Sequence, residues 1–110
     1  MPDPLYELHA GICQTLANPK RLEILNLLRD GERSVGDLAE HMGLSPSNVS
    51  QHLTLLRHKG VITARREGLV VYYRIANQKI IRACDLMREV LLEQLAAGAV
   101  LAENAASETA

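Results

Sequence analysis

Apolar residues near the start of the chain recur every three or four positions, which predicts an amphipathic helix. They are Leu5, Leu8, Ile12 and Leu16. A second helix is predicted to begin at Asn18-Pro19, because Asn suits the N-cap and Pro suits the first helical position. Its apolar residues are Leu22, Ile24, Leu25 and Leu28. Gly31 is expected to end it in the left-handed conformation.

Two further helices are predicted to follow closely. Ser34 and Asp37 have the spacing of a capping box, and Gly43 is expected to end that helix after Leu38 and Met42. Ser45-Pro46 repeats the earlier start signal, and Gly60 is expected to end the helix that follows. Its buried stripe is predicted to be Val49, Leu53 and Leu56.

The pattern then changes to β-rich runs. Residues 61–64 and 69–75 flank a charged turn over residues 65–68, which predicts a β-hairpin. Asn77 is predicted to cap a last helix with a long apolar stripe. That stripe comprises Ile80, Cys84, Met87, Leu91 and Leu95. We therefore expect one domain over residues 1–95 and an Ala-rich, frayed tail over residues 96–110.

The resulting order, ααααββα, is mainly α with a β-hairpin wing and is that of a winged helix-turn-helix. The short link Gly43-Leu44 is the turn, and such a unit places its second helix in the DNA major groove. With its apolar stripe turned inward, that helix presents short polar side chains that suit base edges. They are Ser47, Asn48, Ser50, Gln51, Thr54 and His58.

The net charge of −1 over 110 residues gives no sign of a nucleic-acid binder. The distribution of charge changes this picture. Residues 42–66 contain four basic residues and no acidic one, which leaves −5 for the rest of the chain. A basic segment over the expected DNA-reading helix and wing is what contact with phosphates requires.

Other classes of protein are disfavoured. The only aromatic residues are Tyr6, Tyr72 and Tyr73, too few for stacking single-stranded bases. No apolar run approaches the ~18 residues of a membrane span, and the N-terminus lacks a signal-peptide pattern, so a cytoplasmic location is expected. Scattered histidines and the lack of a Gly-rich phosphate loop argue against an enzyme.

Three stretches together resemble the ArsR (arsenic-repressor) family of bacterial regulators: Leu16 to Leu25, Leu44 to Leu53, and Gly68 to Tyr73. The resemblance extends over about residues 5 to 95. It implies a homodimeric repressor with the first and last helices at the dimer interface. It also implies that the fourth helix enters a palindromic double-stranded operator and that an inducer lowers operator affinity.

The resemblance places Ser47, Ser50 and Gln51 at the family's DNA-contacting positions, with Asn48 and Thr54 as second choices. We expect the wing residues Arg65 and Arg66 to reach the DNA backbone or minor groove. His52, at the shoulder of the buried stripe, is interpreted as supporting the helix rather than reading bases.

The known sensing patterns of the family do not fit. The positions of one zinc-site pattern fall on Asn77, Lys79, Val90 and Glu93, three of which are not comparable ligands. The third helix has no Cys pair, so an arsenic-type site is absent. The cysteines are also not where the sulfur-sensing members carry theirs.

Cys13 and Cys84 remain as candidate sensing thiols, with His9 on the face of Cys13 as a further candidate ligand. Oxidation, persulfidation or a thiophilic metal would suit a thiol pair. Two alternatives stay open for the cysteines and the regulation: ordinary packed cysteines, and a repressor without an inducer. A further alternative is a winged helix that binds protein instead of DNA.

Overall fold

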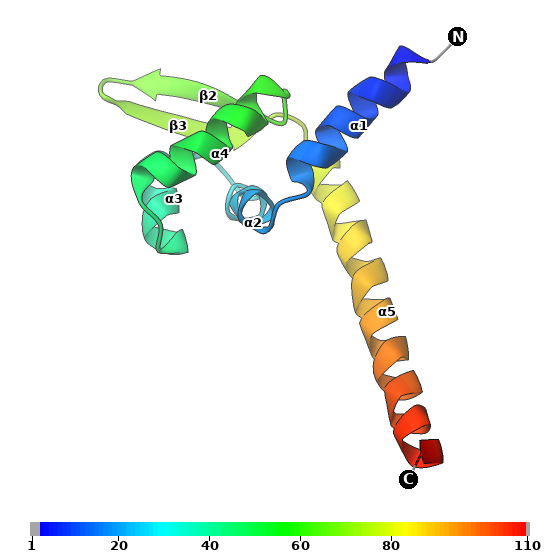
Figure 1. Ribbon diagram of the computed structural model, residues 1–110. Helices are drawn as coiled ribbons and strands as arrows, with labels where there is room; N and C mark the ends of the chain where they lie inside the picture. Colours follow the sequence, from blue (N-terminus) through cyan, green and yellow to red (C-terminus); the bar gives the residue numbers. More distant parts are fainter. Residues whose placement is uncertain (1–2, 110) are drawn as a thin grey trace. The chain divides into compact units, whose positions relative to one another are not determined.

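The computed structural model describes the backbone of residues 3–109 and the side chains of residues 3–98. Its element order confirms the predicted ααααββα fold (Figure 1). One short strand, β1, is present in addition. The elements are α1 (Pro4–Leu16), α2 (Pro19–Leu27), β1 (Arg33–Ser34), α3 (Val35–Met42), α4 (Pro46–His58), β2 (Ile62–Glu67), β3 (Val70–Ile75) and α5 (Lys79–Thr109). One compact unit ends at Ile80, and a second begins at Ile81 within α5. The expected fraying of residues 96–110 stays a prediction.

Side-chain caps fix where the helices begin. Asn18 Oδ1 accepts hydrogen bonds from the backbone N–H groups of Lys20 and Arg21. The Ser34 and Ser45 hydroxyls each accept one hydrogen bond from the backbone N–H three residues later in the chain. Each such cap contributes about 1 kcal/mol to stability. The three helix starts predicted at these residues are confirmed.

Glycines in the left-handed region end two of the helices. Gly43 has φ 65° after α3, and Gly60 has φ 74° after α4, a conformation that costs glycine little. The same expectation for Gly31 is wrong, because its φ is not positive. A hydrogen bond from Gly31 N to Leu28 O closes a turn after α2 without any left-handed residue.

The wing belongs to a three-stranded antiparallel sheet of order β1-β3-β2. Strand β1 pairs Arg33 with Tyr73, and it is too short for its sequence to show an alternating pattern. The predicted turn over residues 65–68 is wrong in extent, since β2 continues to Glu67, which pairs with Val70. The turn residues are Gly68, with φ 63°, and Leu69, with negative φ, as in type II′ hairpins.

The core of the first unit is aliphatic and includes the whole predicted stripe of α4. Its largest fully buried side chains are Ile24, Leu25, Leu28, Leu38, Val49, Leu53, Leu56, Val61 and Ile62. By contrast, three apolar residues of α1 are exposed in the single chain: Leu5 at 66%, Leu8 at 68% and Ile12 at 37%. Along the described residues, no helix has the length and apolarity needed to cross a membrane.

Candidate nucleic-acid interface

The outer face of α4 is polar and open to solvent. Ser47, Asn48, Gln51 and Thr54 are exposed, and Ser50 is half-buried. These side chains are held outward because Val49, Leu53 and Leu56 are fully buried on the opposite side. The structure therefore brings all five sequence-predicted residues of α4 together on one surface.

Local hydrogen bonds leave part of this surface available. Thr54 Oγ1 donates to the Ser50 carbonyl at 2.9 Å, and the Ser45 and Ser47 hydroxyls are 3.3 Å apart. Within the described part of the chain, no hydrogen bond uses the Gln51 side-chain amide. That amide can both donate to and accept from a base edge, the pairing that suits adenine.

His52 lies beside this face and connects α4 to α2. Its Nδ1 accepts a hydrogen bond of 3.3 Å from Arg21 Nε, and Arg21 Nη1 donates to the Thr15 carbonyl at 2.9 Å. Burial lowers the pKa of His52 below 6.5, and the positive charges of Arg21 and Lys20 lower it further. The hydrogen bond from Arg21 to His52 thus helps to hold α4 against α2.

The two wing arginines differ in their surroundings. Arg65 donates to Glu32 at 2.5 and 3.2 Å and to Glu67 at 2.7 Å. Its guanidinium also lies over the Tyr72 ring, 4.9 Å from the centroid. Hydrogen bonds from Arg65 hold the pKa of Glu32 below 4.5, while those to Glu32 and then Glu67 raise the pKa of Arg65. Arg66 is exposed and has no hydrogen bond or ion pair within the described residues.

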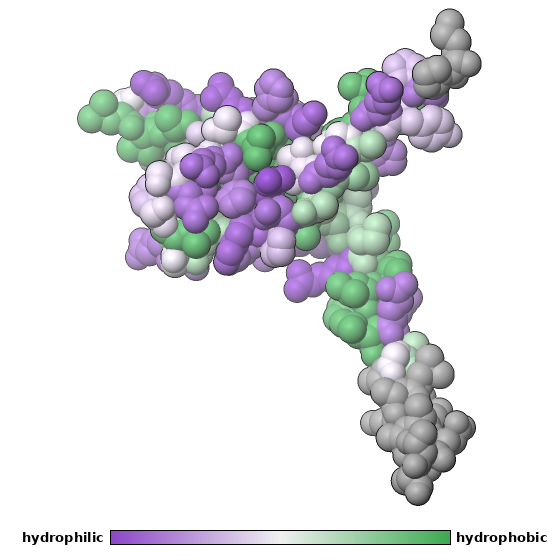
Figure 2. Space-filling model, in the orientation of Figure 1, coloured by the Kyte–Doolittle hydropathy of each residue, from purple (hydrophilic) through white to green (hydrophobic). Residues whose placement is uncertain are grey.

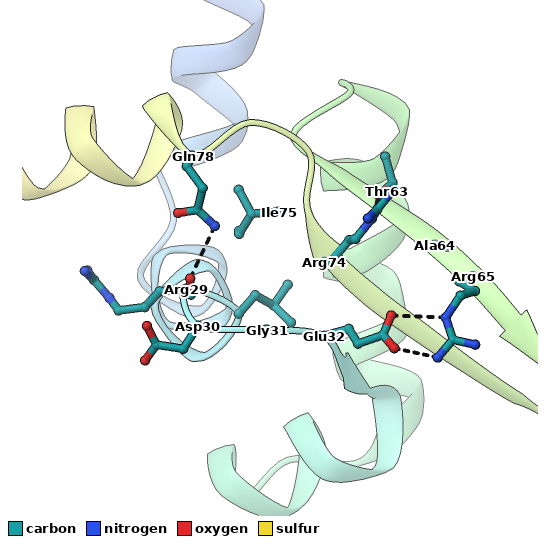
Figure 3. A pocket seen from close by; sticks show the side chains of 11 residues that line it. Arg29, Asp30, Gly31, Glu32, Thr63, Ala64, Arg65, Arg74, Ile75 and Gln78 are labelled. Carbon is teal, nitrogen blue, oxygen red and sulfur yellow. Dashed lines mark hydrogen bonds and ion pairs between the residues drawn. The ribbon is translucent and has the colours of Figure 1, made fainter.

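A hollow of about 800 Å³ lies between the loop after α2 and the outer face of the sheet. Figure 3 shows the Glu32–Arg65 pair on one side of it and Gln78 on the other, where Gln78 Nε2 donates to the Arg29 carbonyl. Arg74 stands between them, and its Nε donates to Thr63 at 3.1 Å. Glu32, Arg65, Arg74 and Gln78 at its border each already form a hydrogen bond, and the Glu32–Arg65 bonds join the loop to the sheet.

The candidate sensing residues lie in different parts of the chain. Cys13 is exposed on α1, Cys84 is half-buried on α5, and both are thiols. His9, one turn before Cys13, is also exposed. Among the described residues, no group of three or more His, Cys, Asp or Glu is arranged to hold a metal ion. Sensing by these thiols stays a prediction.

Sequence reasoning missed three residues that organise this interface: Arg21, Glu32 and Tyr72. Arg21 and His52 are 31 positions apart, and Glu32 and Arg65 are 33 apart. Pairs so distant leave no periodic signal. The sequence offered one usable signal, the alternation of strand residues. It places Arg65 and Arg66 on opposite faces of the sheet.

Comparison with known proteins agrees with this geometry. The family model described as bacterial regulatory protein, arsR family, matches residues 18–64. The HTH-type transcriptional regulator Rv0081 of Mycobacterium tuberculosis is 45% identical over 94 residues, which cover 84% of this chain and 82% of that protein. Its crystal structure matches with a TM-score of 0.77 and 44% identity over 86% of this chain and 96% of that one.

Two other solved structures are similar. The solution structure of Mb0332 from Mycobacterium bovis is described as a homodimeric winged helix-turn-helix DNA-binding domain. It has a TM-score of 0.77 and 39% identity, covering 84% of this chain and 85% of that one. The transcriptional repressor BigR from Xylella fastidiosa has a TM-score of 0.68 and 31% identity, covering 74% and 83%.

Proposed function

Because this chain belongs to the arsR family of bacterial regulatory proteins, we propose that it is a homodimeric repressor of a palindromic operator. Family members are DNA-binding transcriptional regulators and not enzymes.

The main support for this proposal is the polar, solvent-exposed outer face of α4. Ser47, Ser50 and Gln51 are the primary contacts, and Asn48 and Thr54 are secondary ones. The segment from residue 42 to residue 66 lacks acidic side chains, so phosphates can approach this face without repulsion. Hydroxyl and amide groups there read base edges, while basic residues nearby position the duplex.

Dimerisation follows from apolar surface that the single chain leaves uncovered. Leu5, Leu8 and Ile12 of α1 are exposed. On α5, Figure 2 shows apolar side chains gathered along the helix, and these are also exposed. They are Leu86, Met87, Val90, Leu91, Leu92 and Leu95. A second copy of the chain is the simplest cover for both helices, and a two-fold dimer matches a palindromic site.

For induction, we propose a response through Cys13 and Cys84, by oxidation, persulfidation or a thiophilic metal, with His9 as a further ligand in the metal case. The exposure of Cys13 supports this, because reagents reach exposed thiols readily. Operator release is to be measured with oxidant, reactive sulfur and thiophilic metals on the wild type and on a Cys13→Ser, Cys84→Ser double variant. An unchanged response in the double variant would leave the cysteines as packing residues.

In vitro selection from a random pool of DNA duplexes tests the function itself. We expect an enriched palindrome whose half-sites are about one helical turn apart. Recovery of no enriched sequence would favour the alternative, a winged helix that binds protein. A palindrome whose binding survives every thiol reagent would instead favour a repressor controlled only by its abundance.

A further inference from the structure

We infer that Glu32 and Arg65 form an anchor that positions the wing, and that Arg66 alone of the two wing arginines contacts the DNA backbone. This inference rests on the proposed function. It also revises the expectation from the sequence that both arginines reach DNA. Glu32 thereby becomes a positioning residue for operator binding, although it lies outside the acid-free segment and far from α4 in sequence.

Two carboxylates hold the Arg65 guanidinium. Both carboxylate oxygens of Glu32 accept from its guanidinium, and Glu67 accepts from a third nitrogen. This forked arrangement is the strong form of an arginine–carboxylate pair. Two carboxylates around one guanidinium give the cluster a net charge of −1, so it offers little attraction to a phosphate.

Side chains alternate between the two faces of the sheet along β2. Ile62 is fully buried, Thr63 is exposed and Ala64 is half-buried. Successive strand residues point to opposite faces of a sheet, so Arg65 shares the outer face with Thr63. Arg66 projects from the other face, the one that packs against the helices. One DNA surface therefore cannot receive both arginines equally.

The anchor attaches to a loop of the first unit that is itself held in place. Glu32 belongs to the loop between α2 and β1, which is itself fixed at both ends. Arg33 Nε donates to the Leu27 carbonyl at 2.7 Å, and Gln78 donates to the Arg29 carbonyl at 3.3 Å. Figure 3 shows Glu32 reaching from this loop to the Arg65 side chain. The anchor thus ties the hairpin to the body of the first unit.

The position of the anchor along the hairpin explains how it can orient the wing. Strand β1 supports β3 only at Tyr72 and Tyr73, and the hairpin continues past that point to its turn at Gly68. Arg65 pairs with Tyr72 in the sheet register and stacks on its ring. The anchor therefore sits at the last supported position, where it sets the angle at which the free part of the wing leaves the sheet.

Operator affinity measured over a series of salt concentrations separates anchoring from direct contact. The variants are Arg65→Gln, Arg65→Lys, Glu32→Gln, the double variant with Glu32→Gln and Arg65→Gln, and the matched control Arg66→Gln. We expect equal, several-fold losses of affinity for Arg65→Gln and Glu32→Gln, no further loss in the double variant, and a wild-type salt slope in all three. Arg66→Gln should instead flatten the slope by about one.

Arg65→Lys is the decisive substitution, because lysine replaces arginine at a phosphate but lacks the planar fork. If Glu32 and Arg65 form an anchor, Arg65→Lys should lose as much operator affinity as Arg65→Gln. Wild-type affinity in Arg65→Lys, or a flattened slope in Arg65→Gln with no loss in Glu32→Gln, would overturn the inference.

Amide hydrogen exchange of residues 65–72 provides a readout that does not need DNA. Exchange should accelerate in Arg65→Gln and Glu32→Gln and stay at the wild-type rate in Arg66→Gln. Equal exchange rates in all variants would overturn the proposed anchor, even if the variants lose operator affinity as expected. A failure of sequence-specific binding in the wild type would instead count against the proposed function.

Discussion

Arg21 donates a hydrogen bond from Nε to Nδ1 of His52 across 3.3 Å, and this contact joins α2 to the polar helix α4. The acceptor nitrogen must be unprotonated for the bond to form. Protonation of His52 would replace the bond with repulsion from Arg21 and Lys20. This contact between α2 and α4 therefore requires a neutral imidazole.

A pH dependence of stability follows from this contact. The pKa of His52 is lower in the folded chain than its ordinary value of 6.5. The stabilisation is complete above 6.5 and is lost as pH falls through the lowered folded pKa, because the unfolded chain binds the proton first. Urea unfolding between about pH 8 and pH 5.5 should show a falling free energy of unfolding.

The matched control for this pH effect is His52→Asn, whose side-chain oxygen can accept from Arg21 without titrating. We expect a flatter pH dependence in this variant than in the wild type. An identical dependence in both proteins would show that another group is responsible.

Gln51→Ala should lower the preference for the operator over other DNA. The cost is about 1–3 kcal/mol for a good base contact, and binding to random duplex should be almost unchanged because no charge is lost. Competition binding with operator and scrambled duplexes measures both quantities. Equal losses on the two duplexes would remove Gln51 from the residues that read the sequence.

Leu53→Ala should destabilise the fold strongly, because Leu53 is fully buried. Removing such a side chain costs about 2–5 kcal/mol. The matched control is Leu69→Ala at the wing turn, where the side chain is fully exposed and the change should stay within about 0.5 kcal/mol. Chemical denaturation of both variants checks this, and similar losses would contradict the assigned core.

Leu8→Glu should dissociate the proposed dimer. Leu8 is 68% exposed on α1, and a carboxylate placed in an apolar interface must be desolvated without a partner. Leu69→Glu adds the same charge on the wing and should leave the dimer intact. Analytical ultracentrifugation distinguishes the two variants. A dimeric Leu8→Glu protein would place the interface elsewhere.

Much of the first unit could be predicted from the sequence because its signals are local. Asn18, Ser34 and Ser45 cap helices as their spacing indicates, and Gly43 ends α3 as expected. The polar face of α4 followed from helical periodicity once its buried stripe had been identified. These features depend on neighbours within a turn or two, which a single sequence displays.

The features that could not be predicted depend on contacts across the fold. Strand β1 forms only because β3 is available as a partner. The anchoring of Arg65 depends on Glu32, which a chain turn brings to the sheet. Gly31 suited a left-handed helix end by residue type, but a hydrogen-bonded turn removed the need for one.

The most direct test of sequence-specific recognition through α4 is fluorescence anisotropy of the wild-type chain and of Gln51→Ala on the selected operator and a scrambled duplex. We expect the wild type to prefer the operator by roughly a thousandfold or more. The preference should shrink in Gln51→Ala. Equal wild-type affinity for the two duplexes would contradict this expectation.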